Sequence, residues 1–198
     1  MRHFVVRSHA LPADADVSLD DLPGTGRLDL LARCVTSAVL YSHGSRDDTG
    51  ISLVVDGYVV EFDGGTLRRL NPDERSTAAR IRDALGAREG AIGSMAATPS
   101  PGVSIRKGGL GSALEELGSG STVVELHAEG QPVAEVAPPS DPVFVLSDHR
   151  EFTDDESELL GRRADERLSL GPKAIHADQA ITVAHNYLDT AGYTRYLE

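Results

Sequence analysis

The chain has 198 residues, and its 31 acidic residues outnumber its 19 basic residues, which gives a formal net charge of -12. A chain of this length can bury one hydrophobic core, so we expect residues 1–198 to form a single domain. No apolar run reaches the roughly 18 residues of a membrane span, and the first residues lack the pattern of a signal peptide. With one cysteine, Cys34, neither an internal disulfide nor a cysteine-based zinc site is expected. We therefore expect a cytoplasmic protein with no membrane partner.

The charged residues are unusual in composition and unevenly distributed along the chain. Arginine dominates the basic residues, since Lys107 and Lys173 are the only lysines. Many carboxylates with few lysines are typical of a salt-adapted, strongly hydrated surface, although an ordinary acidic protein is the alternative. Residues 111–198 hold most of the excess negative charge, and residues 1–110 are nearly neutral. The arginines of this first part leave nucleic-acid binding open, while the simpler interpretation is that they solvate helix faces.

The first half of the chain predicts strands and an amphipathic helix. Residues 3–7 predict a strand, and a turn-rich connection follows. In residues 27–43, apolar side chains recur every three to four positions, which predicts a helix with Cys34 inside. The apolar runs 51–55 and 58–62 predict a hairpin around Asp56-Gly57. Residues 66–70 are a candidate extension of that sheet.

A second helix and a weak point follow in the sequence. Asn71 is placed to cap a helix, with Pro72 at its first position and Glu74 three residues after the cap, so a helix is predicted up to Gly86. Residues 91–111 are rich in Gly, Ser and Pro. This composition predicts a mobile loop or a weak subdomain boundary.

The second half alternates helices with strands. A short helix is predicted over 110–117, and Thr153 with Glu156 predicts a capping box for a helix to about Arg163. A last helix is predicted over 177–192. The alternation favours an α/β fold with a mostly parallel sheet and helices on both faces. Ligands of such sheets lie at the carboxyl ends of strands, and the strands predicted over 121–126, 142–147 and 166–170 place Leu126, Ser147 and Ser169 there.

Several common sites are absent from the sequence. No glycine-rich phosphate loop of either common type follows a strand, so a Rossmann dinucleotide site or a P-loop is not expected. Ser147, Asp148 and His149 are consecutive, and consecutive residues cannot form a hydrolase triad. His176 and His185 lack the spacing of a zinc-binding helix, so we expect them to order or pack the last helix, and we expect no metal.

Five segments together resemble a known family. They are PGTGRLDLLARCV, SHGSR, NPDERSTAARIRDAL, PVFVLSDH and RLSLGPKAIHADQAITVAHNYLD. These segments resemble the archaeal tRNA pseudouridine N1-methyltransferases, which belong to the SPOUT class and tie their C-terminal segment into a trefoil knot. The resemblance covers nearly the whole chain. It implies a homodimer that transfers a methyl group from S-adenosylmethionine to N1 of pseudouridine 54 in the T-loop of tRNA.

The resemblance also implies where the methyl donor binds. Ser147 stands where the family usually has glycine, and Ala180 where it often has cysteine. Ser45 and Asp47 also depart from the family pattern, at positions where an apolar and a basic or polar residue are usual. The expected donor-binding residues come from three chain segments and the following helix: Leu126, Ser147, Leu168, Ser169, Leu170, Gly171, Pro172 and Ala180.

Candidate roles in catalysis and RNA binding follow from the chemistry of this reaction and from the position of Asp148 after a strand end. Asp148 is the candidate acceptor of the N1 proton, while a turn-capping role for it and catalysis by positioning alone are the alternatives. The expected RNA contacts are Arg27, Arg33, Arg46 and Arg75.

Dimerisation is expected through the last helix, on the apolar stripe of Ala177, Ile181, Ala184 and Leu188, with simple packing on the sheet as the alternative. Two other functions stay open at this point. One is methyl transfer to another RNA target, and the other is RNA binding without catalysis.

Overall fold

The structure is a computed structural model that describes residues 1–93 and 95–196. Its strands are β1 (Arg2–Ser8), β2 (Leu40–Tyr41), β3 (Gly44–Ser45), β4 (Thr49–Val55), β5 (Tyr58–Asp63), β6 (Ala97–Ser100), β7 (Val103–Lys107), β8 (Thr122–Pro132), β9 (Pro142–Ser147) and β10 (Glu166–Ser169). Its α-helices are α1 (Leu28–Val39), α2 (Glu74–Gly86), α3 (Leu110–Leu117), α4 (Asp154–Arg163) and α5 (Ala177–Asp189). Short 3-10 turns lie at Arg88–Gly90 and Val133–Glu135.

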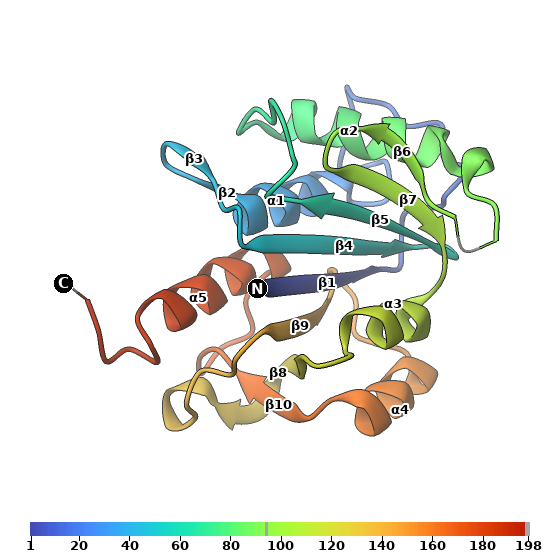
Figure 1. Cartoon of the computed structure of the whole chain (residues 1–198). Helices are drawn as coiled ribbons and strands as arrows, with labels where there is room; N and C mark the ends of the chain where they lie inside the picture. The colour runs from blue at the N-terminus through green and yellow to red at the C-terminus, as the bar shows by residue number, and fades with distance from the viewer. Residues whose placement is uncertain (94, 197–198) are drawn as a thin grey trace.

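One eight-stranded sheet runs through the molecule in the order β10-β8-β9-β1-β4-β5-β7-β6 (Figure 1). From β10 to β4 every neighbouring pair is parallel, and from β4 to β6 every pair is antiparallel. The separate β2–β3 pair is a small hairpin. The mostly parallel α/β sheet predicted from the sequence is therefore confirmed, with an antiparallel edge added to it.

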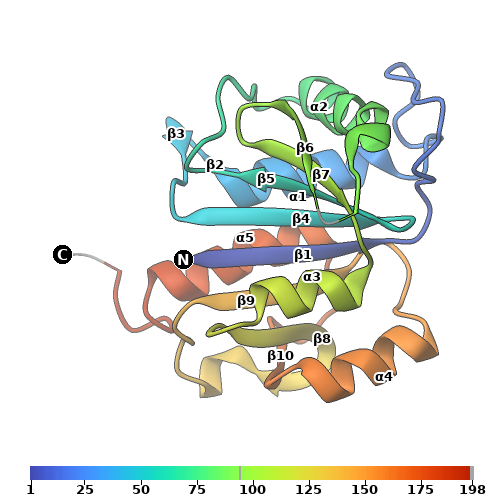
Figure 2. The same ribbon diagram turned by 45° about the vertical axis from the view of Figure 1, so that its right-hand side comes forward.

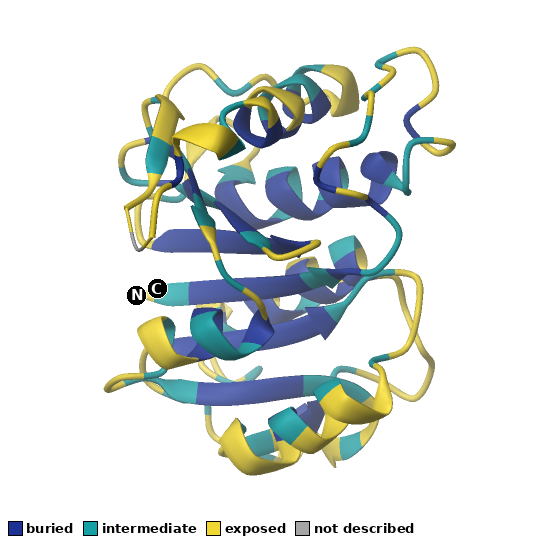
Figure 3. Cartoon of the chain, turned by 90° about the vertical axis from the view of Figure 1, so that its right-hand side faces the viewer, coloured by how far each residue is buried: buried dark blue, intermediate teal, exposed yellow. Residues whose placement is uncertain are grey.

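Helices cover both faces of this sheet (Figure 2). Strand residues alternate between the two faces, so Phe4 and Val6 belong to one buried cluster and Val5 to the other. The larger cluster includes side chains of α1, α2 and α5, and the smaller one includes side chains of α3 and α4. The strands are buried in the middle and the outward helix faces are exposed (Figure 3).

Local sequence signals explain several elements. Asp56 and Gly57 adopt positive φ angles of 41° and 81°, as a two-residue turn between tightly paired strands requires. Thr153 caps α4, because its hydroxyl accepts from the Glu156 N–H and the Glu156 carboxylate accepts from the Thr153 N–H. Cys34 is fully buried inside α1, as its position on the apolar face predicts.

Four local predictions are wrong. The first helix ends at Val39, because the chain turns into the β2–β3 hairpin. Residues 66–70 are not a strand. Asp73, not Asn71, caps α2, since its carboxylate accepts from the Ser76 N–H at 2.7 Å. The stretch 91–111 is not a boundary, because it contains β6 and β7, which extend the sheet.

The apolar stripe on the last helix packs inside the protomer. Ala177, Ile181 and Ala184 are buried in the larger core cluster, and Leu188 packs against that cluster. His185 also lies inside, with its ring against Phe4 and its Nε2 3.0 Å from the Ala38 carbonyl oxygen. The prediction that this stripe forms a dimer interface is therefore wrong. The structure supports the alternative, in which the stripe attaches α5 to the sheet and to α1.

No helix among the described residues is long and apolar enough to cross a membrane.

Candidate active site

A cavity of about 600 Å³ lies at the carboxyl ends of the parallel strands. Three segments far apart in the sequence form it: residues 126–129 of β8, residues 146–152 after β9, and residues 170–180 leading into α5. Of the three strand ends singled out in the sequence, Leu126 and Ser147 line the cavity, and Ser169 is followed directly by Leu170, which also lines it. The cavity lies within the usual range for a small-molecule or cofactor site.

The first wall of the cavity is a bulge in β8. On β10, Glu166 pairs with Val124 of β8 and Arg167 pairs with Glu125. The next β10 residue, Leu168, pairs with Gln131, so the register shifts between Arg167 and Leu168. The β8 residues between these pairs have no β10 partner and bend toward the cavity, where Leu126 and Glu129 line it. A bulge of this kind aims side chains and free backbone groups away from the sheet.

Gly130 closes this bulge where the chain returns to β10. A Cβ atom at Gly130 would lie 2.5 Å from the Leu168 carbonyl carbon and 2.8 Å from the Arg167 carbonyl oxygen. Real Cβ atoms do not approach backbone this closely. Glycine at this position therefore lets β8 and β10 touch behind the cavity.

The second wall is the turn after β9, which a hydrogen-bond network holds in place. The Asp148 carboxylate accepts from the His9 N–H at 2.7 Å and from the Arg150 N–H at 2.9 Å, and it lies 3.3 Å from His9 Nδ1. The Ser147 hydroxyl donates to the Arg150 carbonyl. The Asp148 side chain is only 1% exposed, so its carboxylate braces the turn.

His9 connects this turn to α4. Its Nε2 lies 2.8 Å from Glu156 Oε2, and Arg7 donates to the other oxygen of Glu156. Burial opposes ionisation of Glu156, but the hydrogen bonds from His9 and Arg7 outweigh it and lower the Glu156 pKa to about 2. Glu156 is thus a fixed negative charge that holds His9 and, through it, the turn.

The third wall is the loop from Leu170 and the first turn of α5. The His176 N–H donates to the Gln179 side-chain oxygen at 3.2 Å, which fixes the start of the helix. Ala177 and Ala180 face the cavity from the helix, and Ile175 and Lys173 line it from the loop.

The expected donor-binding residues divide into two groups. Those that line the cavity are Leu126, Ser147, Leu170, Gly171 and Ala180. Leu168, Ser169 and Pro172 are not among the residues that line it; the first two are buried, in β10.

The cavity is also lined by side chains that no sequence pattern singles out. Glu129, His149, Arg150 and Lys173 line it with charged or titratable groups. Apart from the adjacency of His149 to Asp148, no spacing pattern links them, because the β8 bulge and the loop before α5 bring them together.

The four arginines expected to contact RNA are all paired with carboxylates. Arg33 contacts Asp29, Glu74 and Asp178, so it joins α1 to α2 and α5. The other three have these partners: Asp29 for Arg27, Asp189 for Arg46 and Asp20 for Arg75. Arg46 lies near the C-terminal end of α5, whereas the cavity lies at its N-terminal end. The structure therefore does not bring Arg46 together with the others.

The cavity suits a nucleoside that carries a small charged tail. Leu126, Leu146 and Leu170 supply apolar walls for a planar base, and the backbone of the bulge and of the two turns supplies donors and acceptors for its edge. Carboxylates and basic groups both line the cavity, which suits the ammonium and carboxylate of an amino-acid tail. The residues present thus fit S-adenosylmethionine.

The chain matches the model of a family described as putative SAM-dependent RNA methyltransferases over residues 1–193. It is 61% identical to a tRNA (pseudouridine(54)-N(1))-methyltransferase of Haloferax volcanii, over 99% of this chain and 100% of that protein. A Methanopyrus kandleri protein of the same name is 42% identical over 96% and 93% of the two chains.

A solved structure shares the fold. Nep1 of Archaeoglobus fulgidus, bound to S-adenosylhomocysteine, aligns with a TM-score of 0.65 at 15% identity, over 98% of both chains. The two chains therefore share one fold. The chain belongs to the family of S-adenosylmethionine-dependent RNA methyltransferases.

Proposed function

We propose that this protein transfers a methyl group from S-adenosylmethionine to N1 of pseudouridine 54 in tRNA. The observation that carries the proposal is the cavity, in which three segments at the carboxyl ends of β8, β9 and β10 meet in a chain of this family. The names of its full-length relatives support the choice of target nucleotide.

The reaction needs alignment more than strong acid or base catalysis. S-adenosylmethionine supplies a methyl group on a sulfonium, a good electrophile. Pseudouridine has an N1–H that uridine lacks, and this proton must leave as N1 attacks. Rigid cavity walls can contribute roughly 7 to 11 kcal/mol by aligning the reacting groups. The braced turn and the capped start of α5 provide such walls.

Asp148 is proposed as a positioning residue in this reaction. Its carboxylate already accepts from two backbone N–H groups and is nearly inaccessible, so it does not reach a nucleotide directly. The N1 proton would pass to water or to His149, which lines the cavity beside Asp148. The role of proton acceptor first expected for Asp148 remains the alternative that a pH–rate profile would test.

We infer that Arg27 and Arg75 remain candidates for contact with tRNA, whereas Arg33 and Arg46 serve mainly to join helices. Arg75 has a single carboxylate partner, and its side chain is 63% exposed. Arg27 also has one carboxylate partner, Asp29, and the hydrogen bond to Asp29 is the main cause that raises the Arg27 pKa. The negative charge of Asp148 raises the Arg27 pKa further, which places Arg27 near the turn after β9.

A homodimer in the cytoplasm with a threaded C-terminal segment is also proposed. Ile175, which lines the cavity, is a large apolar side chain left 43% exposed, and this favours an interface near the cavity. Light scattering should give about twice the chain mass of 21.0 kDa, and Ile175→Glu should lower it.

The knot would place residues 170–176 inside the connection from β8 to β9. Its support is the contact of α5 with that connection, in which the Tyr187 hydroxyl donates to the Val136 carbonyl. An experimental structure in which residues 170–176 pass outside the connection would contradict the knot.

Nucleoside mass spectrometry after reaction with two tRNA transcripts tests the proposed function. One transcript carries pseudouridine at position 54, and the matched control carries uridine. We expect N1-methylpseudouridine from the first transcript and no methylation of the second. Methylation of a different nucleotide would indicate another RNA target. Donor and tRNA binding without methyl transfer would indicate an RNA-binding protein that retains the fold.

A further inference from the structure

Three arginines lie on the segment that joins β5 to α2 and on α2 itself. Arg68, Arg69 and Arg80 form no ion pair within the described residues, although acidic residues greatly outnumber basic ones. Arg68 donates to the Gly65 and Leu67 carbonyls, and both Arg68 and Arg69 are exposed. In a protein with such an excess of carboxylates, arginines that stay unpaired are available for an external anion.

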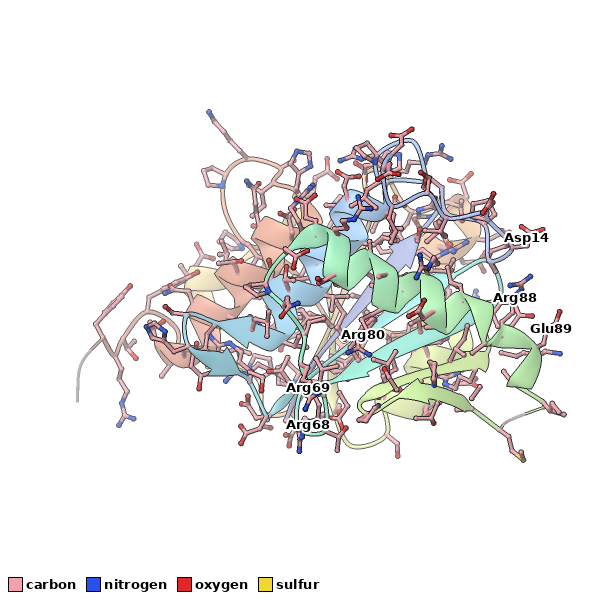
Figure 4. All side chains as sticks on the ribbon, turned by 90° about the horizontal axis from the view of Figure 1, so that it is seen from above. Asp14, Arg68, Arg69, Arg80, Arg88 and Glu89 are labelled. Carbon is pink, nitrogen blue, oxygen red and sulfur yellow. The ribbon has the colours of Figure 1, made fainter. Side chains whose placement is uncertain are left out.

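Arg80 lies on the face of α2 that the segment carrying Arg68 and Arg69 contacts. Asn71 donates to the Ser76 hydroxyl, which attaches the end of the connecting segment to the first turn of α2. Arg80 lies four residues after Ser76 and therefore on the same face of the helix, about 6 Å further along. Figure 4 shows Arg68, Arg69 and Arg80 on one side of α2, whereas Arg88 lies at the far end of that helix.

The carboxylates of the same segment are already occupied. Asp63 accepts from the Gly65 N–H and the Thr66 hydroxyl, and Asp73 caps α2. Neither forms an ion pair with the three arginines. Arg69 has a φ of 56°, a left-handed conformation that Asn or Gly would adopt with less strain. The local structure thus presents this guanidinium to solvent at a position where another residue would fold more easily.

We propose that Arg68, Arg69 and Arg80 form a second tRNA-binding surface that contacts backbone phosphates. This proposal rests on the tRNA methyltransferase function proposed above. Guanidinium groups bind phosphate with paired hydrogen bonds that survive in concentrated salt better than long-range attraction does. Three arginines without carboxylate partners in the described part of the chain, of which Arg68 and Arg69 are exposed and Arg80 is half-buried, are suited to a polyanion with regularly repeated charges.

The segment that carries Arg68 and Arg69 begins at the opposite end of the sheet from the cavity. The Gly64 N–H donates to the carbonyl of Thr49, the first residue of β4, whereas the cavity lies at the carboxyl ends of the parallel strands. A strand of seven residues spans about 23 Å. An RNA strand needs several nucleotides to cover that distance. The arginines would therefore hold phosphates several nucleotides from the target.

A triple variant with a charge-matched control tests the surface. The variant carries Arg68→Gln, Arg69→Asn and Arg80→Gln, and asparagine is chosen because it tolerates the left-handed conformation. The control carries Arg82→Gln, Arg162→Gln and Arg163→Gln, which removes the same charge from arginines that have carboxylate partners. Each protein is assayed for tRNA binding across a potassium chloride series, for steady-state methyl transfer and for S-adenosylmethionine binding.

We expect the triple variant to raise the KM for tRNA about tenfold and to reduce the slope of log affinity against log salt by about 2.7, or 0.9 for each lost phosphate contact. Its kcat at saturating tRNA and its donor affinity should stay within about twofold of wild type. The control should match wild type within about twofold. A KM effect of equal size in both triples would mean that net charge alone matters and would overturn the proposal.

Failure of the surface and failure of the proposed function give different results. Wild-type protein that does not methylate the pseudouridine transcript contradicts the function. Active wild-type protein with an unchanged KM and salt slope in the triple variant contradicts the surface alone. If the variant binds tRNA normally but loses binding to polyglutamate, the arginines serve an acidic protein partner, and the proposal is wrong.

Discussion

Two regions of the molecule, the turn after β9 and the segment that joins β5 to α2, differ in how their charged groups are paired. At the carboxyl ends, Asp148 and Glu156 are bound by His9, Arg7 and backbone groups, and the cavity walls are fixed. On the segment that joins β5 to α2, Arg68 and Arg69 are exposed and form no ion pair with any described residue. We infer that the charged groups beside the small-ligand cavity serve to hold the turn after β9 rigid. The arginines that we propose bind RNA phosphates have no carboxylate partner among the residues that the structure describes.

The largest expected effect is a loss of donor affinity at the cavity, caused by Gly130→Ala. The added Cβ would collide with the backbone of Leu168, separate β8 from β10 and disturb the bulge. Overpacking of this kind costs up to about 3 kcal/mol, so we expect donor affinity measured by calorimetry to fall about a hundredfold. The matched control is Gly171→Ala, a glycine lining the cavity whose added Cβ would meet no atom within 4 Å. Equal effects in both variants would contradict the role of the close approach.

Acid should destabilise the fold through two buried histidines. Burial lowers the pKa of His3 and of His185 to about 4, and for His185 the charges of Arg46 and Arg2 add to the effect. In the unfolded chain both titrate near 6.5, so the unfolded state binds more protons between pH 6.5 and 4. Stability is therefore complete above pH 6.5 and falls toward pH 4, by about 3 kcal/mol for each histidine.

Urea unfolding of wild type and His185→Gln at pH 7 and pH 4.5 measures this effect. Glutamine keeps an N–H donor for the Ala38 carbonyl without an ionisable ring. The variant should lose less stability than wild type on acidification. An identical loss in both proteins would show that His185 is not titrating in this range.

Asp148→Asn should lower methyl transfer about tenfold while the pH–rate profile keeps its shape. The amide keeps one acceptor oxygen but cannot satisfy the N–H groups of both His9 and Arg150 as the carboxylate does. Donor affinity should fall with the rate, because the turn after β9 loosens. If the basic limb of the profile disappears instead, Asp148 is the proton acceptor and the positioning role is wrong.

The smallest expected effects, on stability and on the KM for tRNA, distinguish the role of Arg33 from that of Arg75. Arg33→Gln should destabilise the fold by about 1 kcal/mol, because it removes contacts among three helices and leaves the buried Asp29 with one partner fewer. Its KM for tRNA should change less than twofold. Arg75→Gln should leave stability unchanged and raise the KM about threefold. The reverse pattern would show that the paired arginine, not the exposed one, binds RNA.

Local signals predicted the parts of the fold that depend on neighbouring residues. The Asp56-Gly57 turn, the Thr153 cap and the meeting of three strand ends are all visible in sequence patterns. Strands β6 and β7 escaped prediction, because their glycine-rich surroundings resemble a loop. They are ordered by sheet pairing, β7 with β5 and β6 with β7.

The site could be predicted only in outline. His9 and Asp148 are 139 residues apart, and no sequence pattern predicts the hydrogen bond between them. The spacing of arginines in the sequence likewise does not predict which guanidinium groups have carboxylate partners, because a partner can be distant in sequence. Arg33 and its partner Asp178 are 145 residues apart. Which charges are free is a property of the tertiary structure.

Hydrogen–deuterium exchange with each ligand added separately tests the contrast between the two regions most directly. S-adenosylhomocysteine should protect residues 126–130, 146–152 and 170–177 and leave residues 64–71 unchanged. A tRNA transcript should protect residues 64–71 and the first turns of α2. Protection of residues 64–71 by S-adenosylhomocysteine, or their full exchange in the tRNA complex, would contradict the assignment of the donor and the RNA backbone to opposite ends of the sheet.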